Sequence, residues 1–218
     1  MAQQERAIRT RRMILQGAAE VFDEFGYDAA SIKEILSRVE VTKGALYFHF
    51  PSKEALARGV IQEQTLHLRV AENASKLQEL VDITMAVAHV LPEDAMLRAG
   101  IRLAVERGSV DFGDSNPLLA WTEVLGALAE QAKQQGELLP QVDPMETTEL
   151  IVSSFPGITL YSQVAAGLAD VERRVSVLWQ HLLPSIATPS VLARLDTAPG
   201  RGARALLSVG EAGGESAE

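Results

Sequence analysis

Residues 42–53 combine side chains that can bind phosphate with a short predicted helix that can present them. Lys43 falls in the first helical turn, where the partial positive charge of the helix terminus disfavours a cation. Gly44 follows, although almost any other residue would propagate a helix better, and it leaves the backbone bare. Tyr47 and His49 add aromatic rings with hydrogen-bonding tips. A helix start with these features suits an outside anion, so the stretch predicts phosphate binding.

Two further lysines occupy the same unfavourable position as Lys43. Lys33 and Lys53 each lie in the first turn of a predicted helix, which costs about 0.3–1 kcal/mol against the helix dipole. A single lysine of this kind is an ordinary surface residue, and surface lysines are common. Three of them in one compact unit are better explained by an external polyanion.

The elements that position these residues form a predicted helix-turn-helix. Ser31 and Glu34 make a capping box at the start of a short first helix. A tight connection then leads to Thr42, which is a good N-cap for the second helix. In such a motif the first residues of the second helix meet base edges, so residues 42–44 are expected to do so.

A helix over residues 6–25 precedes this motif, and Gly26 is predicted to end it. Its beginning is basic, and it could be either a solvated helix end or an arm beside a phosphate backbone, entering a minor groove. Four arginines make up this basic start: Arg6, Arg9, Arg11 and Arg12.

The rest of the chain is also predicted to be helical, with no strand pattern and no internal repeat. A long helix from Ser52 to about Ala74 is expected to link two parts of the molecule. Helices over 144–168 and 171–187 are apolar on more than one face, which predicts a dimer interface, and Pro156-Gly157 should kink the first of them. The remaining predicted elements are helices over 76–91, 93–107, 117–135 and 189–208, and a loop over 108–116.

The predicted fold class is all-α, with an N-terminal three-helix helix-turn-helix domain and a larger C-terminal helical domain for ligand binding and dimerisation. The predicted boundaries are 1–52 and 53–208, followed by a disordered tail over 209–218. The charge distribution agrees with two parts. Residues 1–60 hold nine Lys and Arg against eight Asp and Glu, whereas the remainder holds 11 against 21. Such a difference suits units with different partners.

Composition argues against several other classes of protein. The chain of 218 residues has no cysteine, which excludes disulfides and thiolate chemistry and suits a reducing cytosol. No signal peptide and no apolar run of about 18 residues is found, so a cytoplasmic location without a membrane span is expected. The four histidines are scattered, and catalytic and nucleotide-binding motifs are missing. We therefore expect no metal site, no cofactor and no enzyme.

The chain resembles the TetR family of one-component repressors, most specifically over residues 6–58. The similar features are Thr42–Phe50, Ser52–Leu56, a first helix that ends Phe22-x-x-x-Gly26-Tyr27, and the Ser31-x-x-Glu34-Ile35 helix. One branch looks most similar, the γ-butyrolactone autoregulator receptors of antibiotic-producing soil bacteria. Similarity to that branch extends to residues 6–11, 97–104, 136–140, 183–186 and 189–192.

The resemblance implies a homodimer on a pseudo-palindromic operator in double-stranded DNA. Lys43 would read bases, and Gly44 would let the backbone come close. The other DNA-binding residues implied are Thr42, Tyr47, His49 and Lys53 on phosphates, Arg9 on the flanking backbone or minor groove, and Ser31.

The resemblance also implies a small-molecule site in the C-terminal domain. Trp121 matches the family's ligand-pocket tryptophan, and Gln64 and Thr159 lie where members of the branch place polar groups on the lactone. Each of the three would otherwise be an ordinary packed side chain. The apolar lining offered by the C-terminal helices suits a small neutral molecule.

The leading hypothesis is therefore a repressor released from DNA by a γ-butyrolactone, controlling antibiotic or other secondary-metabolite genes. One alternative is a TetR-type regulator for another ligand, such as a furan, a butenolide or an antibiotic. The other is a helical small-molecule-binding protein without regulatory DNA binding.

Overall fold

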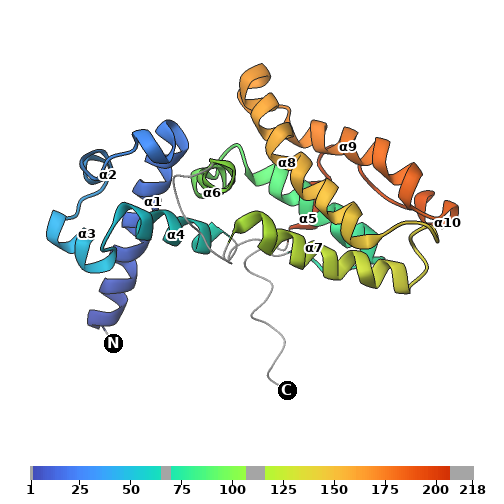
Figure 1. The fold of residues 1–218 in the computed structure, drawn as a ribbon, viewed down its shortest axis with the longest axis horizontal. Coiled ribbons are helices and arrows are strands. Elements are labelled where there is room, and N and C mark those ends of the chain that lie inside the picture. Colours follow the sequence, from blue (N-terminus) through green and yellow to red (C-terminus); the bar gives the residue numbers. More distant parts are fainter. Residues whose placement is uncertain (1, 65–69, 107–115, 207–218) are drawn as a thin grey trace. The chain divides into compact units, whose positions relative to one another are not determined.

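The structure is a computed structural model that describes residues 2–64, 70–106 and 116–206 (Figure 1). In these ranges the regular structure is helical, and the only strand-like pairing is two isolated bridges. The all-α prediction is therefore confirmed. The helices are α1 (Ala2–Ala29), α2 (Ile32–Arg38), α3 (Lys43–His49), α4 (Lys53–Gln64), α5 (Lys76–Val90), α6 (Ala95–Val105), α7 (Pro117–Gln134), α8 (Pro144–Ala166), α9 (Val171–Ile186), α10 (Pro189–Leu192) and α11 (Arg201–Ala205).

The helices group into two compact units, each with its own apolar core. Unit 1 comprises residues 1–67 and 93–117, and unit 2 comprises residues 68–92 and 118–218. This grouping differs from the domain boundary predicted after residue 52, because α4 and α6 both pack in unit 1. The predicted tail over 209–218 lies outside the described residues.

The core of unit 1 is built on the apolar face of α1. Leu56 and Val60 of α4 are fully buried in this core, which explains why α4 belongs with the N-terminal helices. Leu103 of α6 is buried there as well. The α1 side chains in this core recur at helical spacing: Ile14, Leu15, Ala18, Val21 and Phe22.

The C-terminal end of α1 bends at Gly26, where φ is 75° and ψ is 176°. A backbone in this left-handed region favours glycine, and the bend agrees with the helix end predicted there. Hydrogen bonds from α6 hold the bend. The Tyr27 amide donates to Glu106 Oε2 at 2.7 Å, and Arg102 Nη1 donates to the carbonyl oxygen of Asp23 at 2.6 Å. Residues beyond the bend are thereby fixed to unit 1.

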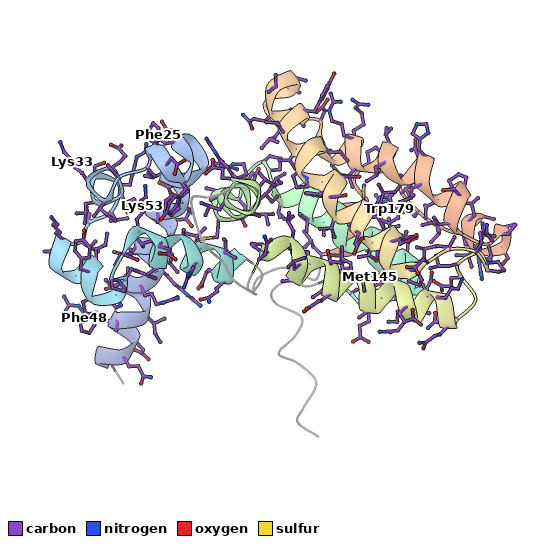
Figure 2. All side chains as sticks on the ribbon, viewed as in Figure 1. Phe25, Lys33, Phe48, Lys53, Met145 and Trp179 are labelled. Carbon is purple, nitrogen blue, oxygen red and sulfur yellow. The ribbon has the colours of Figure 1, made fainter. Side chains whose placement is uncertain are left out.

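Unit 2 packs α5, α7, α8 and α9 around a second core. Trp179 of α9, labelled in Figure 2, is fully buried within it, and its indole N–H donates to Thr84 Oγ1 at 2.8 Å. This bond satisfies the polar atom of a large buried ring, as buried tryptophan requires. Within the described ranges, no helix is long and apolar enough to span a bilayer.

Two predicted helices differ from the structure. The helix from Ser52 was expected to reach Ala74, but α4 is described only to Gln64, and Val70 already pairs with Leu206 in an antiparallel bridge. The helix predicted over 189–208 is two short helices, α10 and α11. Gly200 separates them with a φ of 84°, which a continuing helix could not adopt.

Candidate nucleic-acid interface

The helix-turn-helix predicted from sequence is present in unit 1, and side-chain caps begin both of its helices. Ser31 Oγ accepts from the Glu34 amide at 3.1 Å, and Thr42 Oγ1 accepts from the Ala45 amide at 3.2 Å. Each hydroxyl keeps its own hydrogen for an outside acceptor, because a hydroxyl both donates and accepts. Ser31 and Thr42 are exposed, so both can position a helix and meet a phosphate.

One face of α3 anchors the helix, and the other is exposed. Leu46 is fully buried in the core of unit 1, and Phe50, directly after α3, is nearly so. Lys43 is exposed, and its ammonium group lies 5.9 Å from the centre of the Tyr47 ring. Among the described residues no hydrogen bond or ion pair holds this ammonium group. The charge of Lys43 is therefore available to an outside ligand.

Gly44 is not required by the packing of the protein itself. A Cβ atom placed on Gly44 would have only Thr42 Oγ1 within 4 Å, at 4.0 Å. Its φ is not in the left-handed region either, so any residue could occupy this position in the free protein. A bare backbone at the exposed start of α3 therefore suits close approach of an outside ligand.

Phe48 is a feature of this face that the sequence analysis missed. Its side chain is 84% exposed, and Figure 2 shows it projecting outward from α3. Helical spacing contained the signal, because Phe48 lies two positions, or about 200°, from the buried Leu46. The ring meets the half-buried His49 edge-on at a centroid distance of 5.3 Å. An exposed apolar ring on α3 fits a thymine methyl group or a deoxyribose.

Lys53 was predicted to bind phosphate, but in the structure its side chain binds backbone carbonyl oxygens. Its ammonium group points into unit 1 and lies 4.4 Å from the centre of the Tyr27 ring. The ammonium donates to three carbonyl oxygens at the end of α1: Tyr27 at 2.7 Å, Ala30 at 2.9 Å and Asp28 at 3.4 Å. These carbonyls compensate the unfavourable position of Lys53 in the first turn of α4, so no outside anion is needed to explain it.

The Tyr27 ring that this lysine contacts carries a hydroxyl whose pKa is raised above its usual value. Burial of the ring is the main cause that raises its pKa, and the carboxylates of Glu54 and Asp28 raise it further. The hydroxyl therefore stays protonated near neutral pH, and the ammonium group of Lys53 is the positive charge at this point.

The basic start of α1 divides into paired and free arginines. Arg11 Nη1 lies 3.2 Å from Glu63 Oε2, and Arg12 Nε lies 3.7 Å from Glu63 Oε1. Arg9 is exposed, and no partner for it is found in the part of the chain that the structure describes. Lys33, at the start of α2, is exposed in the same way. Arg9 and Lys33 thus join Lys43 as cations available to a phosphate backbone.

The predicted ligand residues are only partly placed. Trp121 of α7 is half-buried against the core of unit 2. Thr159 of α8 has a buried Oγ1 atom without a hydrogen-bond partner in the described protein. A buried hydroxyl of this kind is rare, and either a water molecule or a bound ligand could be its partner. The side chain of Gln64 lies outside the described residues, and its predicted role is not placed.

No group of three or more His, Asp or Glu side chains within the described ranges could hold a metal ion. The candidate sites are the exposed face of α3 with its flanking cations, and the buried hydroxyl of Thr159.

Comparisons with known proteins match both units. The family model described as bacterial regulatory proteins, tetR family, matches residues 14–60. The model described as tetracyclin repressor-like, C-terminal domain, matches residues 74–188. The first match contains the whole helix-turn-helix with its caps.

Individual relatives match over most of the chain. The A-factor receptor protein of Streptomyces griseus is 45% identical over 195 residues, covering 89% of this chain and 70% of the relative. The crystal structure of full-length native TylP, a TetR regulator from Streptomyces fradiae, is 41% identical with a TM-score of 0.80, covering 93% of this chain and 90% of that one. CprB from Streptomyces coelicolor, solved in complex with its biological operator sequence, is 28% identical with a TM-score of 0.74. The match covers 91% of this chain and 97% of that one.

Proposed function

The chain belongs to the TetR family of bacterial regulatory proteins, and we propose that it is a repressor that a γ-butyrolactone releases from a palindromic operator. The family is one of transcription regulators and not of enzymes. The observation that carries the proposal is the exposed face of α3. It presents the uncommitted cation of Lys43, the unobstructed backbone at Gly44 and the exposed ring of Phe48.

Each chemical feature of this face matches one requirement of DNA binding. Lys43 supplies a donor for guanine in the major groove, and Phe48 supplies an apolar contact for thymine. Thr42, Tyr47 and His49 can bind phosphates beside them, and Arg9 and Lys33 can extend the backbone contacts. The similar protein CprB was solved with its operator, which supports the same use of this motif.

Two features support a homodimer, namely the proposed palindromic operator and the exposed apolar side of α8. The exposed side of α8 carries Leu150, Leu160 and Val164 at helical spacing, and the last is 82% exposed. Large apolar side chains exposed together on one side of a helix support an interface, and a second copy of the chain would cover them. Two copies would place two α3 helices about 34–36 Å apart, in successive major grooves, if the spacing fits.

A small ligand in unit 2 would control this spacing. The buried hydroxyl of Thr159 supplies one hydrogen bond, and Trp121 supplies an apolar face and an indole donor. Similarity to an A-factor receptor supports a γ-butyrolactone as the ligand. The ligand releases DNA only if it binds the non-operator shape of the dimer more tightly than the operator shape. Control of antibiotic genes from the cytoplasm is the corresponding cellular role.

A gel-shift titration with a palindromic operator tests both halves of the proposal. The wild-type chain should bind the operator at low nanomolar to micromolar concentration and lose it when A-factor is added. Binding that A-factor leaves unchanged would reject the ligand, and a screen of furans, butenolides and antibiotics would then test the alternative regulators. Absence of binding at low salt would reject the repressor and favour a ligand-binding protein without regulatory DNA binding.

Thr159→Val separates ligand binding from folding. Valine keeps the shape of threonine but lacks the hydroxyl, so the free protein loses only an unpaired polar atom and its free energy of unfolding should stay equal or rise. A ligand that bonds to this hydroxyl should bind about 5–30-fold more weakly, in line with a loss of about 1–2 kcal/mol. Calorimetric titration with A-factor and urea unfolding measure the two quantities. A destabilised variant with unchanged ligand affinity would show that the hydroxyl has a structural partner instead.

A further inference from the structure

The chain has five lysines, all within the residues that the structure describes, and their surroundings divide them into two groups. Lys33 and Lys43 are exposed and lie in the first turns of α2 and α3, on the helix-turn-helix of unit 1. The other three are partly buried, and each is bound to another part of the protein. They are Lys53, Lys76 and Lys133.

Backbone carbonyl groups bind two of the partly buried lysines. Lys53 donates to three carbonyl oxygens at the end of α1. Lys133 of α7 donates to the carbonyl oxygens of Leu139 at 2.8 Å, Pro140 at 2.7 Å and Val142 at 2.9 Å. An ammonium group has three hydrogens, so each of these lysines uses all of its donors inside the protein. Neither nitrogen can lose a proton without giving up one of these bonds.

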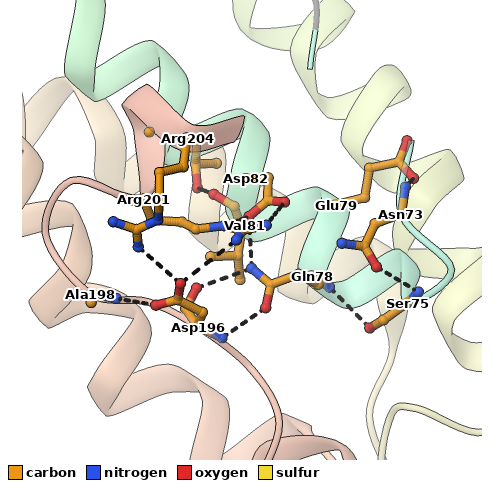
Figure 3. A network of polar contacts seen from close by, with 12 residues as sticks. Asn73, Ser75, Gln78, Glu79, Val81, Asp82, Asp196, Ala198, Arg201 and Arg204 are labelled. Carbon is orange, nitrogen blue, oxygen red and sulfur yellow. Dashed lines mark hydrogen bonds and ion pairs between the residues drawn. The ribbon is translucent and has the colours of Figure 1, made fainter. Parts of the chain in front are cut away.

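A carboxylate binds the third partly buried lysine. Lys76 Nζ donates to Glu79 Oε2 at 2.8 Å, and this hydrogen bond is the main cause that raises the pKa of Lys76 above its usual value. Glu79 is itself fixed in place, because the same oxygen accepts from the amide of Asn73, which lies beside it in Figure 3, at 3.1 Å. Lys76 therefore stays charged and bound.

Lys33 and Lys43 have no hydrogen-bond or ion-pair partner among the described residues. The ammonium group of Lys43 lies 5.9 Å from the centre of the Tyr47 ring, and this contact uses no hydrogen-bond donor. An amine reacts with an acyl donor only when its nitrogen is accessible and can release a proton. Of the five lysines, Lys33 and Lys43 alone meet both conditions without disturbing the fold.

Arginines carry most of the positive charge of the chain and do not react in this way. Of the 20 lysines and arginines, 15 are arginines, whose guanidinium groups stay protonated in proteins. In unit 2, Figure 3 shows Arg201 facing Asp82, with its Nε 2.7 Å from Oδ1 and its Nη2 2.5 Å from Oδ2. A reagent directed at amines therefore leaves such ion pairs intact.

We propose that Lys33 and Lys43 are sites of lysine acetylation, and that their acetylation releases the protein from its operator without a lactone. The effect on DNA rests on the proposed repressor, whereas the choice of sites rests on the surroundings of the five lysines alone. In the reaction, the neutral amine nitrogen attacks the carbonyl carbon of acetyl phosphate. The new C–N bond forms, the bond from that carbon to the phosphate oxygen breaks, phosphate leaves with the electron pair, and the proton of the amine goes to water. The product is an uncharged amide.

Acetylation at these two positions removes DNA contacts and spares the fold. Acetylated Lys43 lacks the charged donor proposed for guanine, and acetylated Lys33 lacks the charge proposed for phosphate. Both charges lie at helix starts, where the helix dipole disfavours a cation, so their removal does not weaken α2 or α3. The melting temperature of the acetylated chain should therefore equal that of the untreated chain or exceed it.

Treatment of the full chain with acetyl phosphate, followed by mass spectrometry of its peptides, tests the two sites without DNA or lactone. Lys33 and Lys43 should react at least about tenfold faster than the other three lysines, which must first open locally. In guanidinium chloride that unfolds the chain, the five rates should become similar, because the fold sets the difference. If Lys53, Lys76 or Lys133 reacts as fast as Lys33 and Lys43 in the folded chain, the proposal is wrong.

Operator titration before and after acetylation tests the effect on DNA. The wild-type chain should lose about fivefold to 100-fold in affinity, in line with the loss of one base contact in each half-site. The double variant Lys33→Arg, Lys43→Arg keeps both charges but cannot be acetylated there, so its affinity should change by less than about twofold from its own untreated value. A double variant that loses as much affinity as wild type would place the responsible group elsewhere and overturn the proposal.

Addition of A-factor to the same titrations separates this proposal from the proposed ligand. A chain that acetylation releases from the operator but A-factor does not would reject the lactone and support acetylation as a release signal of its own. A chain that binds no operator, even at low salt, would reject the repressor and with it the effect of acetylation on DNA. The five reaction rates would still decide whether Lys33 and Lys43 are the acetylation sites.

Discussion

At the scale of single residues, Gly44 separates what the protein needs for folding from what the proposed operator complex needs. Gly44→Ala should raise the free energy of unfolding by about 0.5–1 kcal/mol, because alanine propagates a helix better and no protein atom opposes its Cβ. The same methyl group should weaken operator binding, since it stands between the backbone and the DNA. Urea unfolding and operator titration measure both effects. A variant that is more stable and binds the operator as well as wild type would show that close approach at Gly44 is not used.

Lys53 and Lys33 are a matched pair of first-turn lysines with different surroundings. Lys53→Met keeps the apolar stem over Tyr27 but removes the charge from three carbonyl oxygens, so the free energy of unfolding should fall by about 1–3 kcal/mol. The slope of log affinity against log salt should stay near the wild-type value. Lys33→Met should leave stability unchanged and reduce that slope by about one, because an exposed lysine on phosphate releases one counterion.

The opposite result for Lys53 would restore the role predicted from the sequence. If Lys53→Met keeps its stability and loses one unit of salt slope, the ammonium group turns to phosphate in the DNA complex. Lys43→Ala provides the comparison at the base edges, where loss of sequence preference is expected, with specific binding falling towards the affinity for unrelated DNA.

At the scale of elements, local patterns predict most helix starts and fail where distant parts of the chain meet. The caps at Ser31 and Thr42 follow from residue types and spacing alone, and the structure contains both. Pro199-Gly200 signals the break between α10 and α11, although the prediction passed over it. The pairing of Val70 with Leu206 has no local signal, because it joins residues far apart in the sequence.

In the candidate site, too, some features follow from the local sequence and others depend on contacts between distant elements. Residue types and helical spacing predict the exposed face of α3, and applying the same spacing to Phe48 would have added it. The orientation of Lys53 depends on the carbonyl oxygens that the bend of α1 exposes, and this bend depends in turn on contacts with α6. Such contacts between elements cannot be read from one segment of sequence.

The bend of α1 allows a prediction about α6 with an internal control. Gly26 and Gly136 both have a positive φ, of 75° and 72°. A Cβ atom on Gly26 would lie 2.4 Å from Glu106 Oε1, whereas a Cβ atom on Gly136 would meet nothing within 4 Å. Gly136→Ala should therefore cost about 1–2 kcal/mol for its backbone alone. Gly26→Ala should cost clearly more, because its ψ of 176° is a conformation that only glycine adopts readily and because the methyl group displaces Glu106 from the Tyr27 amide. Equal losses in urea unfolding would show that neither the backbone conformation nor the α6 contact makes Gly26 the more demanding position.

At the scale of the whole molecule, the acidic net charge of −9 and the proposed binding of DNA are compatible because the charge is unevenly distributed. The exposed cations at Arg9, Lys33 and Lys43 lie in unit 1, while the excess of carboxylates lies in the remainder of the chain. Repulsion between the acidic part and DNA is screened beyond about 10 Å at 0.1 M salt. Local contacts at α3 can therefore determine binding, and a dimer doubles the number of such contacts.

Dimerisation through α8 is the feature on which the whole-molecule proposal depends, and two valines on neighbouring helices test it. Val164 of α8 is 82% exposed and Val124 of α7 is 54% exposed, so an aspartate at either position should leave the fold of one chain intact. Val164→Asp places a charge in the proposed interface, where burial without a partner is costly, and should shift the chain to a monomer. Val124→Asp should remain a dimer. Sedimentation measures the oligomeric state, and operator titration should show the monomer binding at least about tenfold more weakly, because two half-sites are no longer bound together. If Val164→Asp remains dimeric while Val124→Asp dissociates, the two chains meet through α7 and the spacing of the α3 helices must be set by that helix instead.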